Sequence, residues 1–488
     1  MSSQSSIIFI MVQVVHSSIC APTSYLEKIV FPELIEVRDI SAEKVLKITE
    51  DLTLYLEKSS VLAKEFLLRT YDGRLMQHTY LDGESLEENL YHDLRSLSSV
   101  MVSQESGLKV EGVLGPRLTI RPSLEAARTA DGHNAHILYE VADETESGSE
   151  AVFTHASSNV PDRQENKGDT VDLIRPELLI CVDSTFASQF PDHKALLRYV
   201  IISVNSVNVR YLTVSEPAVR LRLCAVEVFT VYEESFLYKV NRFVASGKSL
   251  ERLKDYVYNH YYKYEEYDVI YFITGLDMAA YKGYRWEDTQ QGIAYVAGAC
   301  TERKVALGED RAMTYQGVRI CAHELGHLFG CPHDGEKHTN FNSERCPWND
   351  GFIMSYVQHN SRSLKFSWCC KNMIRQHASS AAGSCLRKQN TKRKIKKANF
   401  TSILAGETVG RDQFCKLTFP DAIGSYVLTG DVGKCHVCCY VPPDVDSRGY
   451  RKVFLPDNAW CNENNGTVCL NGDCVQEKLK YKEYQPTK

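Results

Sequence analysis

HELGHLFGCPH, the segment from His323 to His333, is the most informative part of this 488-residue chain. On a helix, His323 and His327 lie about one turn apart on the same face, where two imidazoles can bind one metal ion. Gly330 can adopt the left-handed conformation that ends a helix, and Pro332 disfavours further helix. We therefore expect the chain to reverse after Gly330 and to bring His333 back as a third ligand.

This set of side chains predicts hydrolytic chemistry. Three neutral imidazoles leave one position of a tetrahedral zinc ion open to water, as in catalytic rather than structural zinc sites. Zinc lowers the pKa of that water to about 7, so that Glu324 can take its proton while the hydroxide attacks a peptide carbonyl. Protonated Glu324 can then pass the proton to the leaving amine. The alternative, histidines that are surface residues or core hydrogen-bonding groups, leaves the acid and the glycine unexplained.

The bulk composition is that of a globular protein with about two to four folded units. Hydrophobic residues make up 43% of the chain and the net charge is −6. These values exclude global disorder and a general nucleic-acid-binding surface.

The N-terminus predicts a secreted, extracellular protein. The apolar run Ile7 to Val15 is followed by small residues, which predicts a signal peptide over residues 1–21; the alternative is a buried N-terminal strand or helix. No later apolar stretch is long enough to span a bilayer. Asn399 and Asn465 begin the pattern for N-linked glycosylation, which has meaning in a secreted chain.

The cysteines support this route. Cys20 lies in the expected signal peptide, and the other 16 of the 17 cysteines lie from Cys181 onward. In an oxidising compartment most of them would pair, with a connectivity that the sequence leaves open. The dense cysteines of residues 398–488 predict a small disulfide-stapled module. A zinc knuckle at Cys435 to Cys439 is the alternative, and the secretory route favours disulfides.

Four regions can be separated before that module. Residues Pro22 to Ala142 contain no cysteine and favour strands and turns, with a hairpin at Asp72-Gly73. Asp143 to Thr170 is polar and acidic, and we expect an exposed linker there. The basic segment Arg387 to Lys397 is either a solvated linker or a patch for sulfated glycans.

The region from residue 170 to 387 alternates strand and helix patterns. An α/β (α+β) domain with helices packed on a sheet is therefore expected. The expected strands are Leu178 to Val182, Val219 to Phe229, Val269 to Ile273 and Gly292 to Val296, and the expected helices are one capped by Asp192 and one over Leu250 to Tyr261.

The zinc-binding pattern followed by Gly351-Phe-Ile-Met354-Ser-Tyr356 resembles the metzincin zinc metalloproteases with their methionine turn. Asp334, directly after the third histidine, resembles their reprolysin, or adamalysin, branch. Thr274-Gly-Leu-Asp277 and Gly292-Ile-Ala-Tyr-Val-Ala-Gly298 are similar to tick salivary metalloproteases. The resemblance covers about residues 174–387.

The resemblance implies a metzincin-like catalytic domain over residues 170–387, with a twisted mixed sheet and long helices. It also implies that Gly292 to Gly298 is an edge strand that pairs with an extended substrate, and that Met354 forms a hydrophobic floor under the ligands. Tyr356 stands where the astacin branch places a tyrosine near the metal. It would stabilise the oxyanion or line the pocket wall.

The resemblance also extends to a calcium site. Glu177 and Asp268 match the positions at which reprolysins hold a calcium ion, close to the reprolysin cysteine that matches Cys385 of this chain. Ca²⁺ needs six to eight oxygens, and surface carboxylates without a metal are the alternative.

The resemblance makes residues 22–165 a strand-rich propeptide. Pro22 to Ile180 contains no cysteine, so a thiolate on zinc cannot silence the enzyme, and inhibition would need occlusion or another ligand. No clear dibasic or Arg-x-x-Arg processing site lies between Asp143 and Ile174.

The expected protein is a secreted zinc endopeptidase that cleaves extracellular matrix or clotting proteins such as fibrin, with a C-terminal module that steers substrate choice. The alternative is a catalytically weak binding or adhesion protein that acts through its cysteine-rich tail. The intact Glu324 favours the enzyme, because zinc binds without that residue while proton transfer does not occur without it.

Overall fold

The computed structural model describes most of residues 26–389 and parts of the C-terminal region. The described ranges are 26–35, 43–73, 75–104, 107–123, 134–140, 148–152, 171–338, 341–358, 360–389, 415–416, 418–419, 424–430, 435–443, 448–455, 460–462, 467–470 and 473–476. The predicted signal peptide, both glycosylation sites and residues 390–397 of the basic segment lie outside these ranges. Among the described residues, no helix combines the length and apolar character needed to cross a bilayer.

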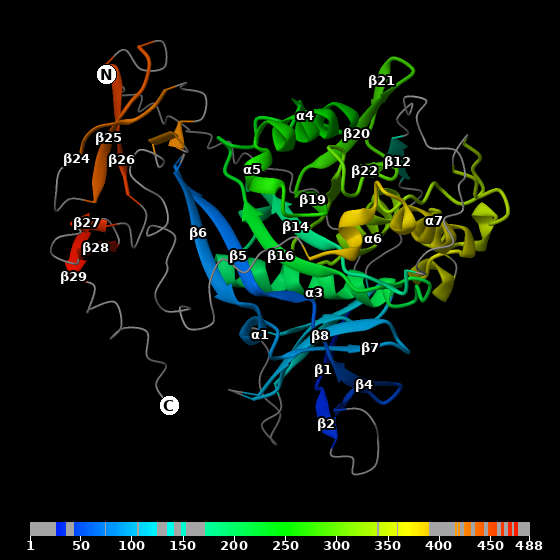
Figure 1. Ribbon diagram of the computed structural model, residues 1–488. Helices are drawn as coiled ribbons and strands as arrows, with labels where there is room; N and C mark the ends of the chain where they lie inside the picture. Colours follow the sequence, from blue (N-terminus) through cyan, green and yellow to red (C-terminus); the bar gives the residue numbers. More distant parts are fainter. Residues whose placement is uncertain are drawn as a thin grey trace, which may run out of the picture.

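A mixed sheet of eight strands forms the centre of the molecule (Figure 1). Neighbouring strands are parallel except for the antiparallel pairs β22 with β23 and β5 with β6. The strands predicted after residue 170 are present in it. In spatial order the strands are β12 (Gly148–Val152), β22 (Gln290–Tyr295), β23 (Val305–Glu309), β19 (Val269–Thr274), β14 (Glu177–Val182), β16 (Arg222–Val228), β5 (Leu62–Asp72) and β6 (Leu75–Asp82).

Helices cover both faces of this sheet. Leu178 and Ile180 of β14 belong to a core shared with α3 and α6, whereas Leu179 and Cys181 belong to a core shared with α4. This alternation is expected for a strand buried on two sides. The main helices are α3 (His193–Tyr211), α4 (Ser246–Asn259), α6 (Gly317–Leu328) and α7 (Trp368–Ser379).

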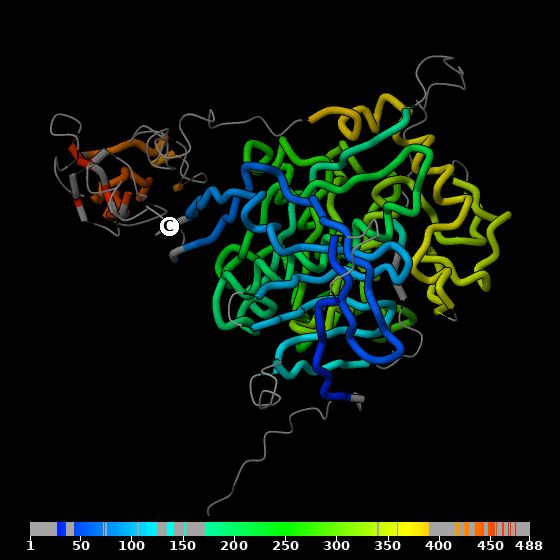
Figure 2. Tube along the Cα trace, turned by 90° about the horizontal axis from the view of Figure 1, so that it is seen from below, coloured from blue at the N-terminus to red at the C-terminus, as the bar shows by residue number. Residues whose placement is uncertain are grey.

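The predicted cap of α3 is confirmed, because the side chain of Asp192 accepts the N–H of Ala195 at 2.8 Å. Nearly every residue of α3 after its first turn is buried. A helix buried on all sides needs a second layer outside the sheet, and a second sheet supplies it. Figure 1 shows this sheet, in blue and cyan, on the side of α3 away from the central sheet, and in Figure 2, which is seen from below, it lies in front.

The second sheet has nine strands from the N-terminal region. In spatial order they are β1 (Leu26–Val30), β11 (His136–Glu140), β10 (Leu118–Pro122), β9 (Lys109–Val113), β8 (Ser98–Ser103), β7 (Leu90–Asp93), β4 (Leu52–Lys58), β3 (Lys44–Thr49) and β2 (Glu33–Ile35). The hairpin predicted at Asp72-Gly73 is confirmed: it joins β5 to β6, and Gly73 has a φ of +60°. This hairpin belongs to the central sheet, next to β16.

The expectation of an exposed linker over residues 143–170 is wrong for residues 148–152. They form β12, which pairs in parallel with β22. Strand addition to a sheet edge is driven by backbone hydrogen bonds, so a polar and acidic segment can make it.

Short elements complete the described chain. They are α1 (Gly83–Leu86), α2 (Ser184–Ala187), α5 (Tyr261–Tyr264), β13 (Leu173–Ile174), β15 (Ala218–Val219), β17 (Lys239–Val240), β18 (Phe243–Ala245), β20 (Asp277–Lys282), β21 (Arg285–Glu287), η1 (Trp348–Asp350), η2 (Ser361–Leu364) and η3 (Ser384–Arg387). The C-terminal region has two small sheets, of β24 (Val427–Gly430), β25 (His436–Tyr440) and β26 (Tyr450–Phe454), and of β27 (Trp460–Asn462), β28 (Thr467–Leu470) and β29 (Asp473–Gln476).

Most of the cysteines pair, as expected. The disulfides are Cys300–Cys385, Cys331–Cys370, Cys346–Cys369, Cys415–Cys439, Cys435–Cys469 and Cys461–Cys474. Because Cys435 and Cys439 are each bonded to another cysteine, the described residues favour disulfides over a zinc knuckle. Cys181, Cys224 and Cys321 are buried free thiols in the apolar core, and Cys438 is a half-buried one.

Candidate active site

Helix α6 carries the first two histidines, and the chain reverses at its end. The N–H of Gly330 donates to the carbonyl of His327 at 2.8 Å, and that of Cys331 donates to the carbonyl of Gly326 at 2.9 Å. Gly330 has a φ of +105°. This pair of bonds is the Schellman arrangement, which requires a left-handed residue at the glycine. The predicted reversal is therefore present.

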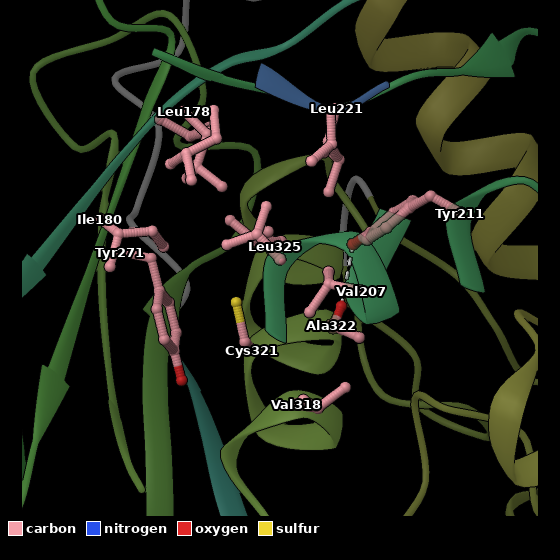
Figure 3. Close-up of a cluster of buried hydrophobic side chains, with 14 of the residues drawn as sticks. Leu178, Ile180, Val207, Tyr211, Leu221, Tyr271, Val318, Cys321, Ala322 and Leu325 are labelled. Carbon is pink, nitrogen blue, oxygen red and sulfur yellow. Dashed lines mark hydrogen bonds between the residues drawn. The ribbon is translucent and has the colours of Figure 1, made fainter. Parts of the chain in front are cut away.

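The opposite face of α6 is anchored in the core. Figure 3 shows Cys321 and Leu325 of this helix among buried side chains that include Ile180, Val207 and Tyr271. The hydroxyl of Tyr211 also donates to the carbonyl of Ala322 at 2.9 Å. The position of α6 is thus fixed on the side away from the histidines.

The three histidines converge on one point. A ligand atom from each of His323, His327 and His333 lies within 4.8 Å of the other two. His323 and His327 have ring centroids 4.7 Å apart, and the distances to His333 are 5.2 and 4.8 Å. The three residues are almost fully buried.

Hydrogen bonds set the orientation of each ring. Nδ1 of His323 donates to the carbonyl of Ile353 at 2.7 Å, and Nδ1 of His327 donates to that of Cys331 at 2.7 Å. Nδ1 of His333 donates to Oε1 of Glu336 at 3.1 Å. The Nε2 atoms of His323 and His327 are buried and meet no hydrogen-bond partner among the described residues. These two nitrogens are buried acceptors, and a hydrogen bond from the other nitrogen of each ring fixes their direction. Such a pair of nitrogens fits the binding of a metal ion.

The protonation states agree with metal binding. Burial and the neighbouring histidines lower the pKa of His327 to about 3 and that of His323 well below its ordinary value. Both rings are therefore neutral at physiological pH, as metal ligands must be. The hydrogen bond from His333 lowers the pKa of Glu336 to about 2, so this residue is a carboxylate beside the third ring.

Glu324 is fully buried and lies against the backbone of β22. A methyl group on Gly292 would overlap with Oε1 of Glu324. The glycine in this strand thus makes room for the carboxylate of Glu324, which follows His323 on α6.

Met354 packs against α6 at Gly326, and its role as a hydrophobic floor under the ligands stays a prediction. A methyl group on Gly326, between the two helical histidines, would stand 2.7 Å from Sδ of Met354. The carbonyl of Met354 accepts the N–H of Asp334 at 2.9 Å, and Oδ1 of Asp334 accepts the hydroxyl of Ser367 at 2.6 Å. These contacts tie the turn that holds Met354 to the chain after His333.

Tyr356 also lies at the site. Its hydroxyl is 3.3 Å from Nε2 of His333, and its ring packs edge-on against Trp348 with centroids 4.8 Å apart. Sequence reasoning missed Glu336, Trp348 and Ser367. Only Glu336 left a signal, as a carboxylate three residues after a ligand.

The two residues predicted to bind calcium lie next to each other. Oδ2 of Asp268 accepts the N–H of Glu177 at 2.9 Å, and the N–H of Asp268 donates to the carbonyl of Glu177 at 2.8 Å. Lys304 is also near, since Asp268 is among the charges that act on its ammonium group. Calcium binding stays a prediction.

The expected substrate strand is β22, and both of its edges are in use. β23 pairs with one edge, and β12 pairs with the other in the register Ser149 to Gly292 and Val152 to Tyr295. β12 also contacts α6. The expectation of an edge strand is therefore wrong for β22, because residues 148–152 occupy the edge that was expected to pair with a substrate.

The fold and the site together define a class of protein: the chain is a metalloendopeptidase. Residues 175–367 match the family described as Reprolysin_5, metallo-peptidase family M12. This match is consistent with a reprolysin-branch metzincin.

Known relatives agree. The chain is 27% identical over 384 residues to the venom metalloproteinase antarease TserMP_A of Tityus serrulatus, covering 75% of this chain and 94% of the relative. It is 26% identical over 382 residues to the antarease-like TtrivMP_A of Tityus trivittatus, covering 74% and 93%. It is 26% identical over 340 residues to "A disintegrin and metalloproteinase with thrombospondin motifs like" of Bombyx mori, covering 66% and 47%.

Among solved structures, metalloproteinase-II from Bacteroides fragilis aligns with a TM-score of 0.37 and 9% identity, covering 69% of this chain and 88% of that one.

Proposed function

We propose that the protein is a secreted zinc endopeptidase in which His323, His327 and His333 hold the ion and Glu324 is the general base. The observation that carries this proposal is the convergence of three buried imidazoles, two of them on the helix that also carries the buried Glu324. Carbonyl groups and Glu336 hold the outer nitrogens of the rings, so their inner nitrogens are oriented before any ion arrives.

A bound zinc ion would supply Lewis-acid chemistry, making water acidic and polarising the scissile carbonyl. Glu324 would accept a proton from the attacking water and later donate it to the leaving amine nitrogen. Gly292 would keep this carboxylate in place, because any larger residue would displace it.

The substrate in this proposal is an extended segment of an extracellular protein. Free β22 can take such a segment as an added strand, which is the interaction that it makes with β12. Matrix or clotting proteins such as fibrin are the substrate class that the family suggests.

The same edge suggests how the precursor stays latent. A substrate strand and β12 cannot occupy β22 at once, so the precursor would be blocked until residues 148–152 leave. The chain has no cysteine between Ala21 and Ile180, so a propeptide thiol cannot block the zinc ion. Latency would then rest on occlusion of the strand edge.

For Tyr356, the proposed role is to donate a hydrogen bond to the oxyanion. Its hydroxyl lies close to the third histidine. Removal of one such donor costs about a hundredfold or more in kcat. If Tyr356→Phe kept its kcat at unchanged zinc content, the tyrosine would only line the pocket wall.

The test compares cleavage of gelatin, fibrinogen and a peptide library by the processed wild type and by Glu324→Ala. Wild type is expected to cut and the variant to be inactive. Equal activity in both would contradict the mechanism. Inactivity of both, with residues 148–152 removed and zinc bound, would favour an adhesion protein that acts through its cysteine-rich tail.

A further inference from the structure

The N-terminal region and the peptidase region share one sheet. β5 pairs in parallel with β16, in a register that places Leu62 opposite Leu223 and Arg69 opposite Glu227. All but the first residue of β16 is buried. Loss of the β5–β6 hairpin would turn β16 into an edge strand with a bare apolar surface, which is an unfavourable state for a folded enzyme.

A buried ion pair joins the two regions. Arg69 donates to Oε2 of Glu227 at 2.7 Å, with 4% and 0% of their side chains exposed. The hydroxyl of Tyr71, also from β5, donates to the other oxygen of Glu227. A carboxylate this deep in the sheet needs its partner, because an uncompensated buried charge is strongly destabilising.

Helix α3 makes a second polar connection. The side-chain amide of Asn205 donates to Oγ of Ser59 at 3.0 Å and to Oγ of Ser99 at 2.9 Å. The hydroxyl of Ser99 in turn donates to the carbonyl of Ile202 at 3.1 Å. Asn205 is 1% exposed, so these N-terminal hydroxyls satisfy a polar group that would otherwise be buried in the helix–sheet interface.

The apolar core is also continuous between the regions. Phe66, Leu90 and Val113 belong to the same cluster of buried residues as α3 and α6. β12, in contrast, adds only five residues, and its Ala151 and Val152 are half-buried. Displacement of β12 would therefore cost far less than release of the strands on α3 and β16.

We infer that residues 43–140 are a permanent structural subunit of this protein, which stays bound to residues 171–389 after the chain between them is cut. The partner that fits the β16 edge and the outer face of α3 is thus the protein's own N-terminal fragment. The inference rests on the interface and holds whether or not the proposed zinc chemistry is right.

The test uses the full chain with the recognition site of a specific protease inserted between residues 153 and 170. After complete cleavage, both fragments are expected to elute together from gel filtration at the size of the uncut chain, and to separate only in denaturant. Elution of the C-terminal fragment alone in native buffer, folded by circular dichroism and with a cooperative melt, would overturn the inference.

Variants identify the contact that holds the fragments. In the cut protein, Arg69→Met should speed dissociation by more than about a hundredfold, since it removes the one cation that forms an ion pair with the buried Glu227 among the described residues. The double variant Arg69→Met with Glu227→Leu should recover much of the loss. The control is Lys64→Met on the same strand, which removes only an exposed pair with Glu84 and should leave the rate unchanged. Equal rates for Arg69→Met and Lys64→Met would refute the role of the buried pair.

Discussion

Gly292 and Glu324 show how a single hydrogen atom in place of a side chain fixes the active site. The strand β22 passes so close to Glu324 that a methyl group cannot fit between them. The group that comes this close to the backbone of β22 is the proposed base.

Gly292→Ala is expected to lower kcat by about a hundredfold, because it displaces the carboxylate from its position beside the histidines. Zinc content should be unchanged, since the ligands are elsewhere. Gly247→Ala is the matched control, because a methyl group there meets no atom within 4 Å. Equal kcat values on a peptide substrate for Gly292→Ala and the control would show that Glu324 does not depend on the glycine.

Single residues of the site could be predicted where the pattern is local. His323, His327 and Gly330 lie within two turns of one helix and its end, so their spacing sets their geometry. The carbonyl of Ile353 and the hydroxyl of Ser367 could not be predicted from spacing. Their distance to the histidines depends on how the loop after His333 folds back, which local preference does not determine.

Among the elements, β12 has the largest consequence for the proposed function, because it pairs with the strand that is expected to bind substrate. Its residues were expected to form a linker because they are polar. Pairing with a strand that is distant in the sequence, here β22, leaves no periodic pattern in residues 148–152 themselves. β14 and β19 could be predicted because strands buried on both faces are continuous apolar runs.

Ala151→Pro should weaken the pairing of β12 with β22, since proline cannot donate to a strand ladder. The uncut variant is then expected to cleave peptides about tenfold faster than the uncut wild type, because each 1.4 kcal/mol of lost pairing is a factor of ten in the open form. The processed forms of both proteins, without residues 148–152, serve as the control and should be equally active. Equal activity of the uncut forms would exclude β12 as the block.

At the scale of the whole molecule, the N-terminal and peptidase regions are built around α3, with a sheet on either side. The sequence predicted a propeptide and a catalytic domain divided near residues 165–170, and the central sheet crosses that division through β5, β6 and β12. Hydrophobic periodicity identifies strands and helices but not their partners. The parallel pairing of β5 with β16 joins residues about 160 apart and could not be read from either segment.

Stability should depend on pH through the buried ion pair. Burial by itself would raise the pKa of Glu227, but Arg69, Lys263 and the hydroxyl of Tyr71 outweigh it and lower the pKa below the ordinary 4.5. The folded pKa is below the unfolded one, so this group stabilises the protein above about pH 4.5, and the contribution is lost as the pH falls through the folded pKa.

Glu227→Gln should therefore flatten the decrease in unfolding free energy between about pH 5 and pH 3, measured by urea denaturation. Glu84→Gln, at an exposed glutamate, is the control and should keep the wild-type slope. A Glu227→Gln protein with the wild-type pH profile would show that this pair does not control acid stability.

The most direct measurement is zinc content and kcat/KM, determined together for the processed wild type and Glu324→Gln. We expect one zinc ion per chain in both proteins and a loss of kcat/KM in the variant of about a thousandfold or more, because the histidines still bind while the proton acceptor is gone. A Glu324→Gln protein that retains its zinc and cleaves at the wild-type rate, or a wild type that cleaves without zinc, would contradict the account.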